Sequence, residues 1–343
     1  MTYSEFRSVL KKGAYGSFFF YGPEAYLKRH TLAAIRNKIA SGENAFNHFR
    51  FNQDSYSAEK AWDAVQCPVF SESGKLVEIE GLSFDAMSDG EIDDLCALMK
   101  NAEKYETTLV LYTEPDEFDP GTEKQPTKLF KKFAASAVPV LFVRETQAKL
   151  IKWIQQHFSA ENVFASADSA ESLIARCGTD MFALSSEISK LSAYVNSRGP
   201  DGDGLRRLTQ DDIAVVCAQN DEFDAFAMTD AIISRDSKKA FAVLSDMKSR
   251  REKPEIILGG ICSTACDMYL IKTLSDLGLS KNEIASKLKI HEYRVGLYLK
   301  RVANRTADEL RFFALRCHDA DFKIKNSFSD SYEIIDKLMA ESM

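Results

Sequence analysis

The strongest constraint on the fold is a change in hydrophobic periodicity near residue 145. Before it, short apolar runs rich in β-branched and aromatic residues alternate with segments of helical periodicity. The apolar runs are residues 17–21, 46–51, 76–79, 108–112 and 138–143. Because strands that alternate with helices of this length form right-handed βαβ units, the first 145 residues predict a mainly parallel sheet.

After residue 145 the strand pattern disappears and helical segments follow one another. One apolar stripe repeats at helical spacing through Met181, Leu184, Ile188, Leu191 and Val195. A polar, Gly-rich break at residues 197–204 interrupts the helices, and a helix-capping pattern begins again at residues 209–212. We therefore expect an α/β domain at 1–145, a small helical domain at 146–212 and an all-helical domain at 213–343.

Charge and cysteine content restrict the function classes. The net charge is −7, which argues against tight DNA binding by the isolated chain, because such proteins usually carry a basic surplus. The seven cysteines are scattered and include no CxxC pair, so we predict reduced, mostly buried thiols and no metal site.

No segment predicts a membrane span or a secretion signal. The most apolar stretch, residues 256–271, contains Ser263, Thr264 and Asp267, which is typical of a buried helix in a soluble protein. The N-terminal residues lack an apolar core behind a basic start. The expected location is the cytoplasm.

The turn after the first predicted strand lies where a phosphate-binding loop would lie. Such a loop needs the pattern GxxxxGK[S/T], because backbone N–H groups surround the phosphates while Lys and Ser/Thr bind phosphate and Mg²⁺. Gly22 and Lys28 match the pattern, but Leu27 replaces the second glycine and Arg29 replaces Ser/Thr. The second nucleotide motif needs four apolar residues followed by an acidic pair that holds Mg²⁺, and the segment Val77-Glu78-Ile79-Glu80 lacks this pattern. We predict a nucleotidase fold without a nucleotide cofactor and without catalytic residues.

The whole chain resembles the bacterial DNA polymerase III delta subunit family, through three segments in the same order. The first is the apolar strand that runs into Gly22-Pro23-Glu24-Ala25-Tyr26-Leu27. The second runs from Gly178-Thr179-Asp180 to Glu187-Ile188-Ser189-Lys190-Leu191, and the third covers residues 280–325.

The resemblance implies a specific architecture and function. The fold would be an AAA+-like α/β domain, a small helical lid domain and a helical collar domain that assembles with other clamp-loader subunits. The function would be to bind and open the sliding clamp, the beta subunit, for loading onto primer–template DNA, without intrinsic ATP hydrolysis. The chain would thus be a non-catalytic component of a DNA polymerase holoenzyme.

The resemblance also implies a clamp-binding element between a helix expected to end near Val65 and the strand expected to start at Lys75. Gln66, Pro68, Val69 and Phe70 lie there, just before a polar Ser-Glu-Ser-Gly run. In the family this position holds a Gln-initiated segment that ends in an apolar pair, so Val69 and Phe70 would insert into the clamp. An alternative from the residues alone is that the pair fills the local core.

Two other function classes stay open at this point. Residues 280–302 are compatible with a helix-turn-helix whose second helix carries Arg294, Lys300 and Arg301, which would indicate a DNA-binding regulator. An active AAA+ ATPase is the second alternative, although both of its nucleotide motifs are defective.

Overall fold

The protein is described from a computed structural model that covers residues 1–12, 16–39, 46–68, 74–122, 124–200, 204–217, 221–327 and 330–343. The chain divides into two compact units, Met1–Glu145 and Thr146–Met343.

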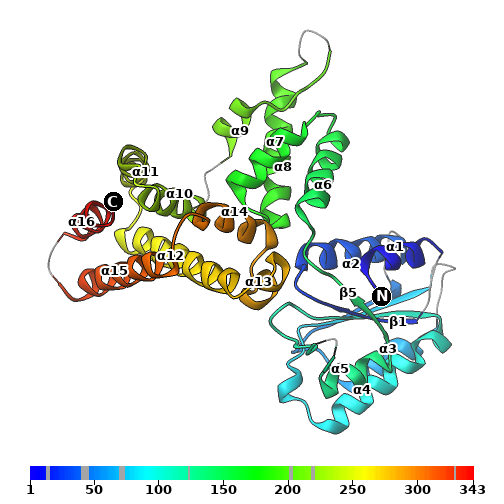
Figure 1. Cartoon of the computed structure of the whole chain (residues 1–343). Helices are drawn as coiled ribbons and strands as arrows, with labels where there is room; N and C mark the ends of the chain where they lie inside the picture. The colour runs from blue at the N-terminus through cyan, green and yellow to red at the C-terminus, as the bar shows by residue number, and fades with distance from the viewer. Residues whose placement is uncertain are drawn as a thin grey trace. The chain divides into compact units, whose positions relative to one another are not determined.

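The first unit is built on a five-stranded parallel sheet, as predicted (Figure 1). Its strand order is β2-β3-β4-β1-β5. The strands are β1 (Gly16–Tyr21), β2 (His48–Phe51), β3 (Lys75–Glu80), β4 (Thr107–Tyr112) and β5 (Val138–Leu141). β2 and β5 are each two residues shorter than the predicted runs, and Phe46 lies outside the sheet with 87% of its surface exposed.

Helices cover both faces of this sheet (Figure 1). α1 (Tyr3–Lys12) and α2 (Ala25–Ile39) lie on one face, and α3 (Ala58–Gln66), α4 (Asp89–Asn101) and α5 (Lys128–Ala134) lie on the other. Two 3₁₀ turns, Phe84–Ala86 and Ala102–Tyr105, flank α4.

Alternation along the strands assigns each side chain to one face. The core on the α3–α5 face includes Phe19, Val77, Ile79, Leu109 and Leu111. On the opposite face Phe6 of α1 packs edge-on against Phe18 and Phe20, with ring centroids 4.8 and 5.2 Å apart. Glu78 and Glu80 alternate with the first set and therefore face α2.

The second unit begins with four helices: α6 (Gln147–Ala160), α7 (Ala167–Cys177), α8 (Met181–Arg198) and α9 (Gln210–Val216). The predicted apolar stripe of α8 is buried along its whole length, from Met181 to Val195. The capping box predicted for α9 is present, with Thr209 and Asp212 bonding reciprocally. The predicted domain boundary at residue 212 falls inside α9, and the division of this unit into two domains stays a prediction.

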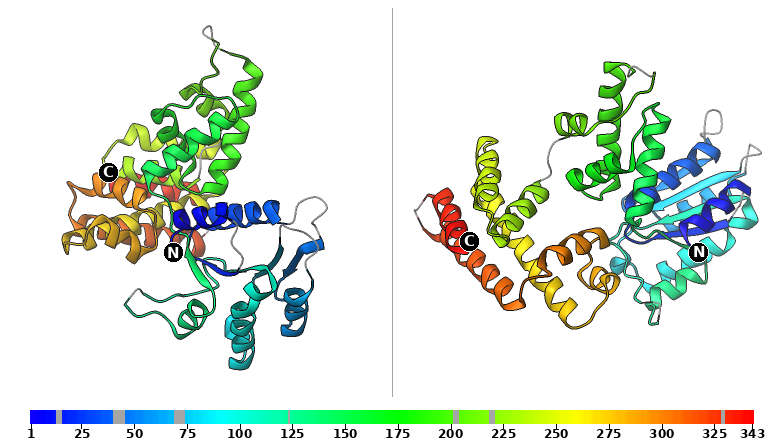
Figure 2. Two further views of the ribbon diagram at one scale, coloured as in Figure 1. Left: turned by 90° about the vertical axis from the view of Figure 1, so that its right-hand side faces the viewer. Right: turned by 45° about the horizontal axis from the view of Figure 1, so that its top comes forward.

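The remaining helices pack around a long central helix, α12 (Figures 1 and 2). They are α10 (Asp221–Ile233), α11 (Ser237–Ser249), α12 (Pro254–Asp276), α13 (Lys281–Leu288), α14 (Glu292–Val302), α15 (Ala307–Asn326) and α16 (Ser331–Ser342).

α12 is apolar because it contributes to two cores. Ile257, Leu258 and Ile261 pack in one cluster with α10, α15 and α16, while Met268 and Ile271 pack in another with α13 and α14. By length and composition alone, α12 is long and apolar enough to cross a membrane. Its part in both cores accounts for that composition.

Candidate functional site

The turn between β1 and α2 approaches the neighbouring strand too closely for a side chain at Gly22. Gly22 has φ +109°, and a Cβ added there would overlap the carbonyl oxygen of Phe142. The N–H of Glu24 donates to that same oxygen at 3.2 Å. Glycine is required here both by its positive φ and by this contact.

Glu24 occupies the amino end of α2, where a phosphate would bind in a nucleotidase. Its residue surface is only 9% exposed, and Oε1 accepts a hydrogen bond from the N–H of Tyr26 at 3.2 Å. Exposed N–H groups and the helix dipole make such an end favourable for anions. In this protein the carboxylate of Glu24 takes the place of an external anion.

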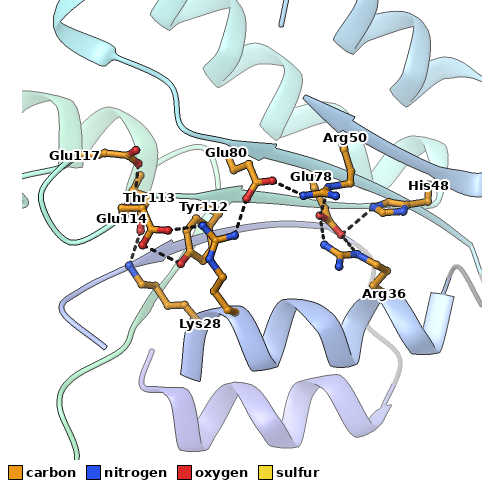
Figure 3. Close-up of polar contacts among 11 residues, drawn as sticks. Lys28, Arg36, His48, Arg50, Glu78, Glu80, Tyr112, Thr113, Glu114 and Glu117 are labelled. Atoms are coloured by element: carbon orange, nitrogen blue, oxygen red, sulfur yellow. Dashed lines mark hydrogen bonds and ion pairs between the residues drawn. The ribbon is translucent and has the colours of Figure 1, made fainter. Parts of the chain in front are cut away.

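Lys28 points to the end of β4 (Figure 3). The side chain is fully buried, and its ammonium donates to the carbonyl oxygen of Thr113 and lies 5.0 Å from the ring centre of Tyr112. Burial lowers the pKa of Lys28 from its ordinary value of 10.5 to about 8, while the carboxylates of Glu114 and Glu117 oppose the shift. The lysine that matches the phosphate-binding pattern is thus used to join α2 to the sheet.

Glu78 on β3 is the centre of a buried ion-pair network (Figure 3). Its side chain is 1% exposed and accepts two hydrogen bonds from Arg36, at 3.0 Å from Nε and 2.7 Å from Nη2. Nε2 of His48 lies 2.9 Å away, and Arg50 also pairs with this carboxylate. Such a fork-to-carboxylate pair is among the stronger protein hydrogen bonds, and it raises the pKa of Arg36.

Glu80, two residues further along β3, continues the network (Figure 3). It pairs with Arg29 at 3.2 Å and with Arg50 at 2.6 Å, and Arg29 also binds Glu114. Both carboxylates that face α2 are therefore neutralised by arginines. This arrangement fits a structural ion-pair network better than a Mg²⁺ site, because Mg²⁺ needs carboxylate oxygens that are free of cations.

The predicted clamp-binding element begins at the end of α3. Gln66 is the last residue of that helix, and both Gln66 and Pro68 are exposed. Val69 and Phe70 lie outside the described residues. The structure thus places the first half of the element on the surface.

A buried lysine supports the end of α3, and the sequence analysis did not identify it. Lys75 has no exposed surface, and its ammonium donates to the carbonyl oxygens of Val65, at 2.6 Å, and Cys67. Burial lowers its pKa. The sequence signal that could have found Lys75 is a charged residue at the start of a strand whose two faces are both covered.

The segment proposed as an alternative helix-turn-helix forms α13 and α14. Ile284, Val295, Tyr298 and Val302 are buried in a cluster with α12. Arg294 binds Asp267 of α12 at 3.2 Å, and Arg301 lies 3.4 Å from Asp230 of α10. Two of the three basic residues expected to read DNA are thus paired within the unit, which disfavours the regulator alternative.

The strand order is that of an AAA+-like fold, and the residues of the turn that match a phosphate-binding pattern make structural contacts within the unit. Residues 18–143 match the family model described as "DNA polymerase III, delta subunit", and residues 222–342 match the model of the "DNA polymerase III delta subunit, C-terminal domain". The chain belongs to the DNA polymerase III delta subunit family.

Individual relatives are similar along nearly the full length. DNA polymerase III subunit delta of Bacillus subtilis (strain 168) is 21% identical over 349 residues, covering 99% of this chain and 96% of the relative. A probable DNA polymerase III subunit delta of Aquifex aeolicus (strain VF5) is 21% identical, covering 93% and 88%. The solved structure of the Bacillus subtilis DNA clamp loader delta protein matches with a TM-score of 0.71 and 19% identity, covering 100% and 99%.

Proposed function

We propose that this chain is the clamp-opening subunit of a bacterial clamp loader. It binds the sliding clamp, favours an open ring, and supports loading of the ring onto primer–template DNA. The observation that carries the proposal is the match of nearly the whole chain to delta subunits, in sequence and in fold. Its helical second unit supplies a collar that assembles with the other loader subunits in the cytoplasm.

The proposed contact with the clamp is the segment at the end of α3. Gln66 hydrogen-bonds at the mouth of the clamp pocket, Pro68 directs the chain outward, and Val69 and Phe70 insert. Burial of an apolar side chain of this size contributes about 1.5–3 kcal/mol, so two adjacent anchors can dominate a modest interface. The exposure of Gln66 and Pro68 supports this placement.

Opening follows from differential binding. A closed ring is in equilibrium with a sprung ring, and a segment that fits the sprung ring better shifts the population toward it. No nucleotide is needed by this chain for that step. The carboxylate of Glu24 at the α2 end and the arginine partners of Glu78 and Glu80 support the absence of ATP binding.

Clamp binding is tested by calorimetry with the purified full chain and a bacterial sliding clamp. The double variant Val69→Ala/Phe70→Ala is expected to bind about a hundredfold more weakly, since two lost anchors amount to about 3 kcal/mol. Phe46→Ala is the matched control, because it removes an aromatic side chain that is 87% exposed on another connection. Equal binding by wild type and double variant would place the contact elsewhere.

Opening and nucleotide binding need separate measurements. A pair of fluorophores across the clamp interface should separate when the wild-type chain binds, and a clamp that is bound but stays closed contradicts the opening role. A fluorescent ATP analogue should show no saturable binding to the isolated chain, whereas an ATP-binding loader subunit serves as the positive control.

A further inference from the structure

Two thiols and one carboxylate from three helices of the second unit meet at one point. Cys177 is the last residue of α7, Glu187 lies on α8, and Cys217 directly follows α9. Their sulfur and oxygen atoms all lie within 4.8 Å of one another. Cys177 and Cys217 are 7% and 3% exposed, so the group lies beneath the surface.

The surrounding backbone holds these residues in place. Arg176, next to Cys177, donates from Nε to the carbonyl oxygen of Cys217 at 2.9 Å and from Nη2 to that of Ala214 at 3.2 Å. Gly178, with φ +84°, ends α7 and allows the chain to turn into α8. The two cysteines are therefore brought together by backbone contacts that do not involve their own side chains.

The carboxylate of Glu187 is oriented with one oxygen engaged. Oε1 accepts a hydrogen bond from Lys190 at 2.7 Å. Oε2 is buried and accepts no hydrogen bond from a nitrogen or oxygen donor of the described residues, while the thiol of Cys217 interacts with this carboxylate. A thiol is only a weak donor, so the buried oxygen is poorly satisfied, and such a group calls for an explanation such as an ion.

We propose that Cys177, Cys217 and Glu187 bind a thiophilic divalent cation, with Zn²⁺ as the best match. Two thiolates and one carboxylate supply three ligands, and water completes a tetrahedron. Zn–S bonds of about 2.3 Å place two sulfur ligands about 3.8 Å apart, so small side-chain rotations close the group around the metal. The thiolates exclude Mg²⁺ and Ca²⁺, which take oxygen ligands.

Such a metal would link the end of α7, the middle of α8 and the residue that follows α9. α9 has only seven residues and cannot be stable alone. Lys190 would hold the second oxygen of Glu187 and orient the ligating one, which is the usual role of a group behind a metal ligand. This site goes beyond the clamp-opening function and does not depend on it.

The chain contains a matched pair of thiols that lacks the third ligand. Cys262 on α12 and Cys317 on α15 also lie within hydrogen-bonding distance of each other. Within the described ranges, only the Cys177 group joins three such ligand atoms. Cys317→Ser therefore removes a buried thiol of the same kind without touching the proposed site.

The test is a Co²⁺ titration of the full chain after removal of metals with a chelator. The wild type and Cys317→Ser should bind one Co²⁺ with thiolate-to-cobalt charge-transfer absorption, and Zn²⁺ should displace it. Cys217→Ser should lose at least about half of this absorption, because one of the two thiolates is gone, and Glu187→Gln should bind at least tenfold more weakly. Far-UV circular dichroism confirms that each variant is folded.

A second readout covers a variant that folds poorly. Zn²⁺ at a hundred times its Kd should stabilise the wild type by about 2.7 kcal/mol, and the gain should be smaller for Glu187→Gln. A wild-type chain without charge-transfer absorption overturns the proposal. Undiminished wild-type absorption in Cys217→Ser overturns it as well.

Discussion

The ammonium of Lys75 donates a 2.6 Å hydrogen bond to the carbonyl oxygen of Val65, and neither residue has exposed surface. The contact joins the first residue of β3 to the last turn of α3, across the segment that carries the proposed clamp contact. Carbonyl groups at the end of a helix have no partner within it, and a cation there satisfies them and interacts favourably with the helix dipole.

Replacing Lys75 by Met should destabilise the first unit. The carbonyl oxygens of Val65 and Cys67 would lose the ammonium donor, and Val65 would keep only the long 3.4 Å hydrogen bond from Thr107, at a cost of about 1–3 kcal/mol for a poorly satisfied buried group. Urea unfolding measures the loss. Lys60→Met, at an exposed position of α3, is the control and should change stability little. Equal stability of the two variants would mean that other donors replace Lys75.

The same pair of variants tests whether Lys75 positions the clamp contact. Lys75→Met should bind the clamp more weakly than Lys60→Met at a temperature where both are folded, because Gln66 and Pro68 would follow a looser helix end. Full affinity in Lys75→Met would show that the element adopts its binding conformation without this support.

Removing the charge of Glu78 should cost more than removing that of Glu80. Glu78→Gln removes a carboxylate that is 1% exposed from Arg36, which is 34% exposed, and losing hydrogen bonds to such a charged group costs about 1.5–3 kcal/mol. Glu80 is 18% exposed and its pairs reach solvent, so Glu80→Gln should cost about 1 kcal/mol or less. Denaturant unfolding compares the two, and similar costs would contradict a buried network centred on Glu78.

Lys28 should make the free energy of unfolding depend on pH in the alkaline range. The pKa of Lys28 is about 8 in the folded chain and close to 10.5 when unfolded, so the unfolded chain holds the proton more tightly. The contribution of this group is constant below pH 8, and stability then rises with pH up to about 10.5, by about 3 kcal/mol. The Lys28→Met variant should lack this rise, whereas Lys100→Met, at an exposed site on α4, should keep it.

Alanine substitutions at Gly22 and Gly16 distinguish the cost of backbone strain from the cost of steric overlap. Both have positive φ, +109° and +121°, so alanine at either position is strained by about 1–3 kcal/mol. Only at Gly22 would the new Cβ overlap a carbonyl oxygen, since nothing lies within 4 Å at Gly16. Gly22→Ala should therefore unfold at lower urea concentration than Gly16→Ala, and the reverse order would contradict the close approach to Phe142.

Local patterns in the sequence predicted much of the fold. The parallel sheet follows from alternating periodicities, the buried stripe of α8 from spacing, and the start of α9 from the capping residues Thr209 and Asp212. The altered loop at Gly22 and Lys28 is also visible in the residues alone. Each of these features follows from the order and spacing of residues along the chain, so the sequence contains the information directly.

Only the tertiary structure decided the contacts between residues that are distant in the chain. Arg36 meets Glu78, Lys28 meets Thr113, and Cys177 meets Cys217, over separations of 42, 85 and 40 positions. The sequence analysis predicted no metal site because the cysteines are scattered, and the fold brings two of them beside Glu187. Such contacts depend on how helices and strands pack against one another, and hydrophobic periodicity does not encode that packing.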